Sequence, residues 1–201
     1  MSFVSFARVA SLWFAFWAAS AFAIDAGMAA PDFSVPDANG KVVKLSDYKG
    51  KFVVLEWTNP ECPFVRAQYG AGTMQALQKE AGAKDVVWLA VNSTNKAHGE
   101  YKTGGQMIEW MKDKDGAPKA ILIDATSDTG RAYAAKTTPH MFVIDPAGRI
   151  VYAGAIDDKR STRESDRKTA NNYVRAALNE ATAGKPVSVS DTAPYGCSVK
   201  Y

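Results

Sequence analysis

The sequence predicts a mixed α/β domain in which helices cover both faces of a central sheet. Two apolar runs, residues 51–57 and 86–92, have the composition of strands that are buried on both faces. Each run is followed by a longer segment with helical spacing of its apolar residues, at 62–82 and at 104–114. This alternation predicts that the two strands are parallel and are joined by a right-handed crossover.

The remaining elements are shorter and are bounded by turn residues. Strands are predicted at 33–35, 41–45 and 120–124, a hairpin at 141–145 and 149–154, and helices at 127–135 and 165–183. Gly70 and Gly72 interrupt the helical pattern of residues 62–82, so we expect a kink there. The tail, residues 185–201, is predicted to be irregular, because its prolines prevent a long helix.

The first 23 residues have the pattern of a secretory signal. Arg8 precedes an apolar stretch at 9–19, and the small residues of Ala21-Phe22-Ala23 form a cleavage site. We therefore predict a signal peptide at 1–23, one domain at 24–184 and the tail at 185–201. Secretion across the inner membrane, to the periplasm, would put the cysteines in an oxidising compartment. The alternative is an N-terminal anchor that is not cleaved.

The charge balance excludes one class of partner. The chain has 24 basic and 21 acidic residues, a formal net charge of +3, and no basic run with interleaved aromatic residues. We therefore expect no nucleic-acid partner, and contact with a membrane only through the N-terminal signal. A run of charges of both signs at 157–168 is predicted to be a solvated loop and helix start.

Cys62 is the strongest candidate for catalysis. It stands where an apolar strand turns into a helix, and Pro63 suits the first helical position. A thiolate is stabilised there by the unpaired amides and by the helix dipole, with Arg66 as an added cation one turn later. The sequence therefore predicts a nucleophile at Cys62, with a buried and inert cysteine as the alternative.

Several short motifs, in their order and spacing, resemble those of thioredoxin-fold redoxins of the peroxiredoxin-like type (alkyl hydroperoxide reductase and thiol-specific antioxidant). The motifs are Ala30-Pro31-Asp32-Phe33, the strand leading to Cys62-Pro63, Thr137-Thr138-Pro139 before the hairpin, and the hairpin itself. The resemblance covers about residues 30–183. It implies a thioredoxin-like fold with a mixed central sheet.

The resemblance also implies which residues contact a substrate. In this family the peptide bond before the hairpin strand is cis and packs against the reactive sulfur, which makes Pro139 the candidate cis-proline. Thr138 would present backbone groups to a bound partner. Pro63 and Trp57 complete the predicted substrate-binding set.

The sequence departs from both well-known classes of the family. Val65 stands where a dithiol protein has its second cysteine. The peroxiredoxin motif is Pro-x-x-x-Thr-x-x-Cys, but in this sequence Asn59 stands at the threonine position, three residues before Cys62, and Thr58 lies one residue too early. Peroxiredoxins also have a later arginine that activates the peroxide, and its position in this sequence would fall close to Pro139. Arg66 and Arg131 are the candidate substitutes for that arginine.

Two further residues have open roles. Cys197 could resolve a mixed disulfide on Cys62, pair with another molecule, or anchor the tail. Glu56 could shuttle the thiol proton, because a buried carboxyl has a raised pKa; the alternative is a partly solvated acid at the strand end. A copper or zinc site at Cys62, His140 and Met141 lacks a second cysteine, so we predict no metal and no cofactor.

Three functions are compatible with the sequence. The first is an exported thiol–disulfide oxidoreductase that acts through Cys62 on protein or small-molecule thiols and disulfides. The second is a peroxiredoxin-like thiol peroxidase. The third is a non-catalytic binding module in which Cys62 and Cys197 form a structural disulfide. One fold serves all three functions, so the fold does not select among them.

Overall fold

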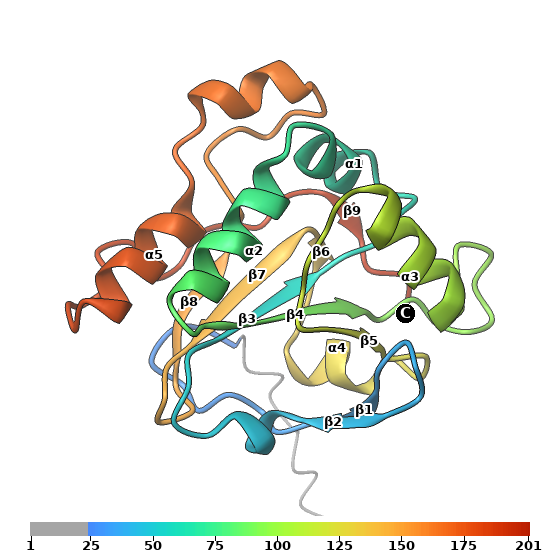
Figure 1. The fold of residues 1–201 in the computed structure, drawn as a ribbon, viewed down its shortest axis with the longest axis horizontal. Coiled ribbons are helices and arrows are strands. Elements are labelled where there is room, and N and C mark those ends of the chain that lie inside the picture. Colours follow the sequence, from blue (N-terminus) through green and yellow to red (C-terminus); the bar gives the residue numbers. More distant parts are fainter. Residues whose placement is uncertain (1–23) are drawn as a thin grey trace, which may run out of the picture.

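The computed structural model describes residues 24–201 (Figure 1). The predicted signal peptide, residues 1–23, lies outside the described residues. Between residues 24 and 201, none of the helices is long and apolar enough to cross a membrane.

A five-stranded mixed sheet forms the centre of the fold, in the order β5-β4-β3-β7-β8. Its strands are β3 (Val53–Trp57), β4 (Val87–Asn92), β5 (Ala120–Ile123), β7 (His140–Ile144) and β8 (Ile150–Gly154). Strands β3, β4 and β5 are parallel to one another, whereas β7 pairs antiparallel with both of its neighbours, β3 and β8. The predicted strands and the parallel pairing of the first two are thus confirmed. Strand β3 lies in the middle of the sheet, and all five of its residues are buried.

Helices lie on both faces of the sheet, as predicted (Figure 1). One face is covered by α1 (Pro63–Gly70), α2 (Thr73–Ala83), α3 (Gly104–Asp113) and α5 (Tyr173–Thr182). The other face is covered by α4 (Asp128–Ala132), by the 3-10 helix η1 (Leu45–Tyr48) and by the hairpin of β1 (Ser34–Pro36) and β2 (Val42–Lys44). Each face therefore has its own apolar core.

Two predicted helices are broken in the structure. The segment 62–82 divides into α1 and α2 because Gly72 has a φ of 75°, a left-handed conformation that ends one helix before the next begins. The segment 165–183 divides into the 3-10 helix η2 (Glu164–Thr169) and α5. The Asn172 side chain caps α5 by accepting from the Arg175 amide at 2.8 Å, so the α-helix begins there.

The tail is more ordered than its sequence predicts. Two of its residues form β9 (Cys197–Ser198), which pairs antiparallel with β6 (Thr137–Thr138). Figure 1 shows β9 between α1 and α3, beside β6. The prediction of an irregular tail is therefore wrong at this point, because its hydrogen bonds go to a distant segment.

Candidate functional site

Cys62 is the N-cap residue of α1, directly after the turn that follows β3. The turn is closed by a hydrogen bond from the Cys62 amide to the Asn59 carbonyl oxygen at 3.0 Å. The Asn59 side chain accepts from the Glu61 amide at 2.8 Å, which fixes the turn further. Pro63 occupies the first helical position and is exposed, whereas Cys62 is only 1% exposed.

Two groups lie against the Cys62 sulfur. The thiol donates to the Thr138 carbonyl oxygen at 2.9 Å, and the Cys197 sulfur lies 2.7 Å away. The peptide bond between Thr138 and Pro139 is cis, as the family resemblance implies. The β6–β9 pairing sets Cys197 directly opposite Thr138. The fold therefore brings together four of the predicted site residues, Cys62, Thr138, Pro139 and Cys197, from three parts of the chain.

The two sulfurs have different surroundings. Cys62 is buried, whereas Cys197 is partly exposed. Burial, and after it the hydrogen bond and the charge of Cys62, raise the pKa of Cys197 to about 12.

Arg66 is occupied by groups other than the sulfur. Its Nε donates to the Pro60 carbonyl oxygen and its Nη2 to the Glu61 carboxylate, both at 2.6 Å. Glu61 also binds the Lys102 ammonium at 2.6 Å. The hydrogen bond from Lys102, together with the charges of both cations, lowers the pKa of Glu61. The positive charge of Arg66 is thus largely offset by Glu61.

Arg131, the other candidate for a peroxidase arginine, packs over the ring of Tyr201 at 4.6 Å from its centroid. The Tyr201 hydroxyl donates to the Ala135 carbonyl oxygen at 2.5 Å. Arg131 therefore helps to hold the end of the described chain.

Glu56 lies on the sheet face whose core contains Cys62. Its partners across the sheet, Ala90 and Met141, both belong to that core. The carboxylate is fully buried, so the alternative of a partly solvated acid is wrong. It accepts from the Tyr69 hydroxyl at 2.9 Å and from Trp88 Nε1 at 2.8 Å. Burial raises the pKa of Glu56 to about 7, although the hydrogen bonds oppose this rise.

Replacing Glu56 with glutamine should remove a pH-dependent loss of stability. The folded pKa of about 7 exceeds the ordinary glutamate pKa of 4.5, so this carboxyl favours folding below pH 4.5, and its contribution is lost as pH rises through 7. The loss is on the order of 3 kcal/mol at pH 8. Urea unfolding at pH 4.5, 6 and 8 measures it.

The matched control for this prediction is Glu80→Gln. Glu80 lies on the surface, where Arg175 binds it at 2.7 Å. This variant should keep the pH profile of the unmodified chain. Parallel profiles for Glu56→Gln and the unmodified chain would contradict the prediction.

Trp57 lies on the opposite face of the sheet from Cys62. It has no exposed surface and packs in the second core, and its Nε1 donates to Ser93 Oγ at 3.0 Å. Side chains alternate along a strand, so Glu56 and Trp57 point to opposite faces. The prediction that Trp57 contacts a substrate does not fit this placement, and Trp57 is left out of the proposed site.

His140 is 5% exposed, and its Nδ1 accepts from the Lys136 amide at 3.2 Å. It is therefore a hydrogen-bonded residue of the core. Among residues 24–201, no group of three or more His, Cys, Asp or Glu side chains is arranged to hold a metal ion.

A buried polar network that the sequence does not predict supports the tail two residues before Cys197. The Tyr195 hydroxyl donates to Asp157 at 2.5 Å and accepts from Arg167 Nη1 at 2.9 Å. Gln68 Nε2 donates to Asp157 at 2.7 Å. Asp157 and Arg167 are buried, so the prediction of a solvated run at 157–168 is wrong for these two residues. A tyrosine two residues before a cysteine, in a tail rich in polar residues, was the available signal.

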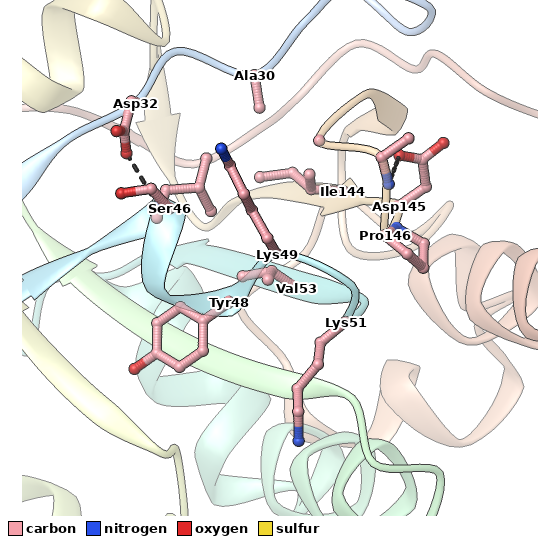
Figure 2. A pocket seen from close by; sticks show the side chains of 13 residues that line it. Ala30, Asp32, Ser46, Tyr48, Lys49, Lys51, Val53, Ile144, Asp145 and Pro146 are labelled. Atoms are coloured by element: carbon pink, nitrogen blue, oxygen red, sulfur yellow. Dashed lines mark hydrogen bonds between the residues drawn. The ribbon is translucent and has the colours of Figure 1, made fainter.

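A pocket of about 390 Å³ lies at the other end of β3, away from the cysteines (Figure 2). Its lining includes Val53, the first residue of β3, whereas Cys62 follows the last. Asp32 accepts from the Ser46 amide at its rim, at 3.1 Å (Figure 2). Neither cysteine lines this pocket, so it is separate from the site.

Known proteins resemble this chain in sequence. The thiol-disulfide oxidoreductase ResA of Bacillus subtilis (strain 168) is 32% identical over 135 residues, which span 64% of this chain and 66% of ResA. The alignment thus covers just under two thirds of that relative's length. Thioredoxin-like protein YneN of the same organism is 30% identical over 145 residues, 71% of this chain and 80% of YneN.

Solved structures share the fold. The hypothetical protein SMc02350 of Sinorhizobium meliloti 1021 superposes with a TM-score of 0.76 at 25% identity, over 90% of this chain and 96% of that chain. A putative thiol:disulfide interchange protein DsbE of Chlorobium tepidum gives 0.59 at 26% identity, over 80% and 99%. These matches confirm the predicted thioredoxin-like fold and, with ResA, support the prediction of an oxidoreductase.

A family model agrees with these matches. The model described as the AhpC/TSA family matches residues 26–153, which include β3, Cys62 and the hairpin of β7 and β8 up to Ala153. That span is more than half of the chain. The resemblance carried by the motifs around Cys62 and Pro139 is therefore confirmed, and the chain belongs to the AhpC/TSA family.

Proposed function

We propose that this chain is an exported thiol–disulfide oxidoreductase in which Cys62 and Cys197 form the redox pair. The observation that carries the proposal is the 2.7 Å separation of the two sulfurs at the N-terminus of α1. The cis peptide bond at Pro139 beside them and the similarity to ResA support it further. The pair takes the place of the Cys-x-x-Cys motif that Val65 interrupts.

The reaction begins with attack of the Cys62 thiolate on a protein or small-molecule disulfide. A bond forms between Cys62 Sγ and one substrate sulfur, and the other substrate sulfur leaves as a thiolate. Cys197, after losing its proton, then attacks Cys62 Sγ and releases the second substrate thiolate. The substrate disulfide gains two electrons, and the chain ends with a Cys62–Cys197 disulfide. An external thiol later reduces that disulfide.

Glu56 is the proposed proton store for these steps. Its carboxyl has a pKa of about 7, so near neutral pH it exists in both protonation states. It lies on the sheet face whose core contains Cys62, where Tyr69 and Trp88 donate hydrogen bonds to it. When it is ionised, a carboxylate with these properties can take a proton from a buried thiol pair. The thiolate then forms as the carboxylate becomes neutral, so the number of buried negative charges does not rise.

Peroxide reduction is the less well supported function of the same site. A peroxidase needs a cation beside the sulfur to activate the peroxide, but Arg66 is held by Glu61 and Pro60. Asn59, in the threonine position of peroxiredoxins, donates to Glu100 at 2.8 Å. Neither side chain is free to bind a peroxide at Cys62.

The test is a comparison of the purified chain with its Cys62→Ser and Cys197→Ser variants. Each protein is equilibrated with glutathione buffers of graded potential, and is then assayed for turnover of a peptide disulfide and of hydrogen peroxide. We expect a Cys62–Cys197 disulfide that reduces well above about −300 mV, the range of catalytic disulfides. Cys62→Ser should lose turnover, and Cys197→Ser should accumulate a mixed disulfide.

The alternatives give distinct results in the same assays. A disulfide that is reduced only at potentials below about −300 mV would be a structural bond, and the chain would then be a binding module. Faster turnover of peroxide than of the peptide disulfide would mean a peroxidase. For export, the measured quantity is the mass of the N-terminus after expression in a bacterium: removal of residues 1–23 is expected.

A further inference from the structure

The tail covers the backbone edge at which the family resemblance locates a bound partner. Strand β9 pairs with β6, and the Val199 amide donates to the Lys136 carbonyl oxygen at 3.2 Å. As a result, Thr138 is 3% exposed and Pro139 is buried. While the tail stays docked, an external peptide cannot pair with this edge.

Gly196 makes this close approach feasible. Its φ is 143°, and a Cβ at this position would lie 2.0 Å from the Thr138 carbonyl oxygen. Any larger residue would push the tail away from β6. The residue before Cys197 is thus fitted to the docked position.

Tyr195 anchors the docked tail. Its ring packs against Phe64 of α1, with 5.7 Å between the centroids, and only 6% of the residue is exposed. Its hydroxyl joins the buried Asp157–Arg167 ion pair described above. The anchor lies two residues before Cys197, so it restricts where that sulfur can go.

The docked tail leaves the two sulfurs unequally accessible. Cys62 is 1% exposed, because β9 and the Thr138 carbonyl oxygen cover it, whereas Cys197 is partly exposed. A thiolate must reach a disulfide sulfur directly in order to attack it. We propose that an external thiol which reduces the Cys62–Cys197 disulfide attacks Cys197, and that Tyr195 is the positioning residue that makes this the accessible sulfur.

The chemistry of the leaving group favours the same direction. The external thiolate forms a bond with Cys197 Sγ, the bond between Cys197 and Cys62 breaks, and Cys62 leaves as a thiolate. That charge forms at the N-terminus of α1, where the helix dipole stabilises it. Attack at Cys62 would instead expel Cys197, whose pKa is raised by burial, which makes it a poor leaving group.

A second external thiolate completes the reduction. It attacks the external sulfur of the mixed disulfide, so an external disulfide forms and Cys197 leaves and takes up a proton. Two external thiols are oxidised and the chain gains two electrons. In the oxidised chain the disulfide itself keeps the tail docked. Cys62 becomes accessible to a disulfide substrate only after reduction, when the tail can leave β6.

This inference rests on the proposed redox pair, and one experiment separates the two. The oxidised chain is mixed with limiting glutathione as a probe thiol, quenched in acid within seconds, alkylated and digested. Mass spectrometry then locates the glutathione. We expect at least ten times more glutathione on Cys197 than on Cys62. Equal amounts, or an excess on Cys62, would overturn the inference while leaving the redox pair intact; an oxidised chain without a Cys62–Cys197 bond would overturn both.

Tyr195→Phe tests the positioning role. This variant keeps the ring against Phe64 but removes the hydroxyl from Asp157 and Arg167, so the tail should leave β6 more often. The ratio of glutathione on Cys197 to that on Cys62 should fall at least fivefold. Tyr173→Phe, at the start of α5, is the matched control and should keep the ratio. A lower melting temperature with an unchanged ratio in Tyr195→Phe would mean a purely structural tyrosine.

Discussion

Replacing Arg167 with leucine is expected to lower the free energy of unfolding by about 3–5 kcal/mol, because the change leaves a buried carboxylate without its cation. Arg167 Nη1 donates to both oxygens of Asp157, at 2.9 and 2.7 Å, and both side chains are at most 2% exposed. Arg167 Nη2 also donates to the carbonyl oxygens of Lys159 and Ser161, at 2.7 and 3.0 Å. Urea unfolding at pH 7 measures the loss.

Two further variants separate the buried charge from other effects. Arg163→Leu removes an exposed arginine that binds Asp166 at 3.2 Å, and should cost less than about 1 kcal/mol. Asp157→Asn combined with Arg167→Leu removes the unpaired charge, and should be more stable than Arg167→Leu alone. A double variant no more stable than the single one would show that lost hydrogen bonds, rather than the charge, cause the effect.

The parts of the fold that the sequence predicted are those that local patterns determine. The apolar runs of β3 and β4, the turn into Cys62-Pro63 and the Thr138-Pro139 pair each lie within a few consecutive residues. Their chemistry, two-sided burial or a helix start, does not depend on distant partners. The central sheet and the position of Cys62 could therefore be predicted.

The features that could not be predicted depend on contacts between distant segments. Asp157 and Arg167 belong to a run of mixed charges that would be solvated without Tyr195, 38 residues from Asp157, and Gln68, 89 residues from it. Likewise, β9 forms only because β6 offers a free edge. Neither partner can be identified from residues near the tail, so the sequence left the role of Cys197 open.

The sequence does not determine the side of the sheet to which Glu56 points, for a different reason. Side chains alternate along a strand. A shift of one residue in the alignment of this strand with that of thioredoxins therefore exchanges Glu56 and Trp57 between the two faces. The turn before Cys62 made that shift hard to exclude from the sequence. The pairing of Glu56 with Ala90 and Met141 assigns it to the face of Cys62.

Acid should destabilise the chain through His140. Burial, and then the charge of Lys136, lower the pKa of His140 from 6.5 to about 3. The neutral imidazole therefore contributes stability that is fully present above pH 6.5 and is lost as pH falls toward 3, since the unfolded chain binds a proton that the folded chain does not. The loss is about 2 kcal/mol at pH 5 and about 4 kcal/mol at pH 3.

His140→Asn isolates this contribution. The amide oxygen of asparagine can accept from the Lys136 amide in place of Nδ1, which now accepts at 3.2 Å. The variant loses the packing of the ring against Phe142, 4.5 Å between centroids, but that loss is the same at every pH. Its unfolding free energy should therefore fall less than that of the unmodified chain between pH 6.5 and 5.

His98→Asn is the matched control, because His98 is the other of the two histidines and is exposed. It should retain the pH profile of the unmodified chain. Glu56 acts in the opposite sense between pH 4.5 and 7, so the two buried groups partly cancel in the unmodified chain and only the differences between variants reveal them. If His140→Asn and the unmodified chain lose stability equally between pH 6.5 and 5, His140 takes up its proton in the folded state as readily as in the unfolded chain.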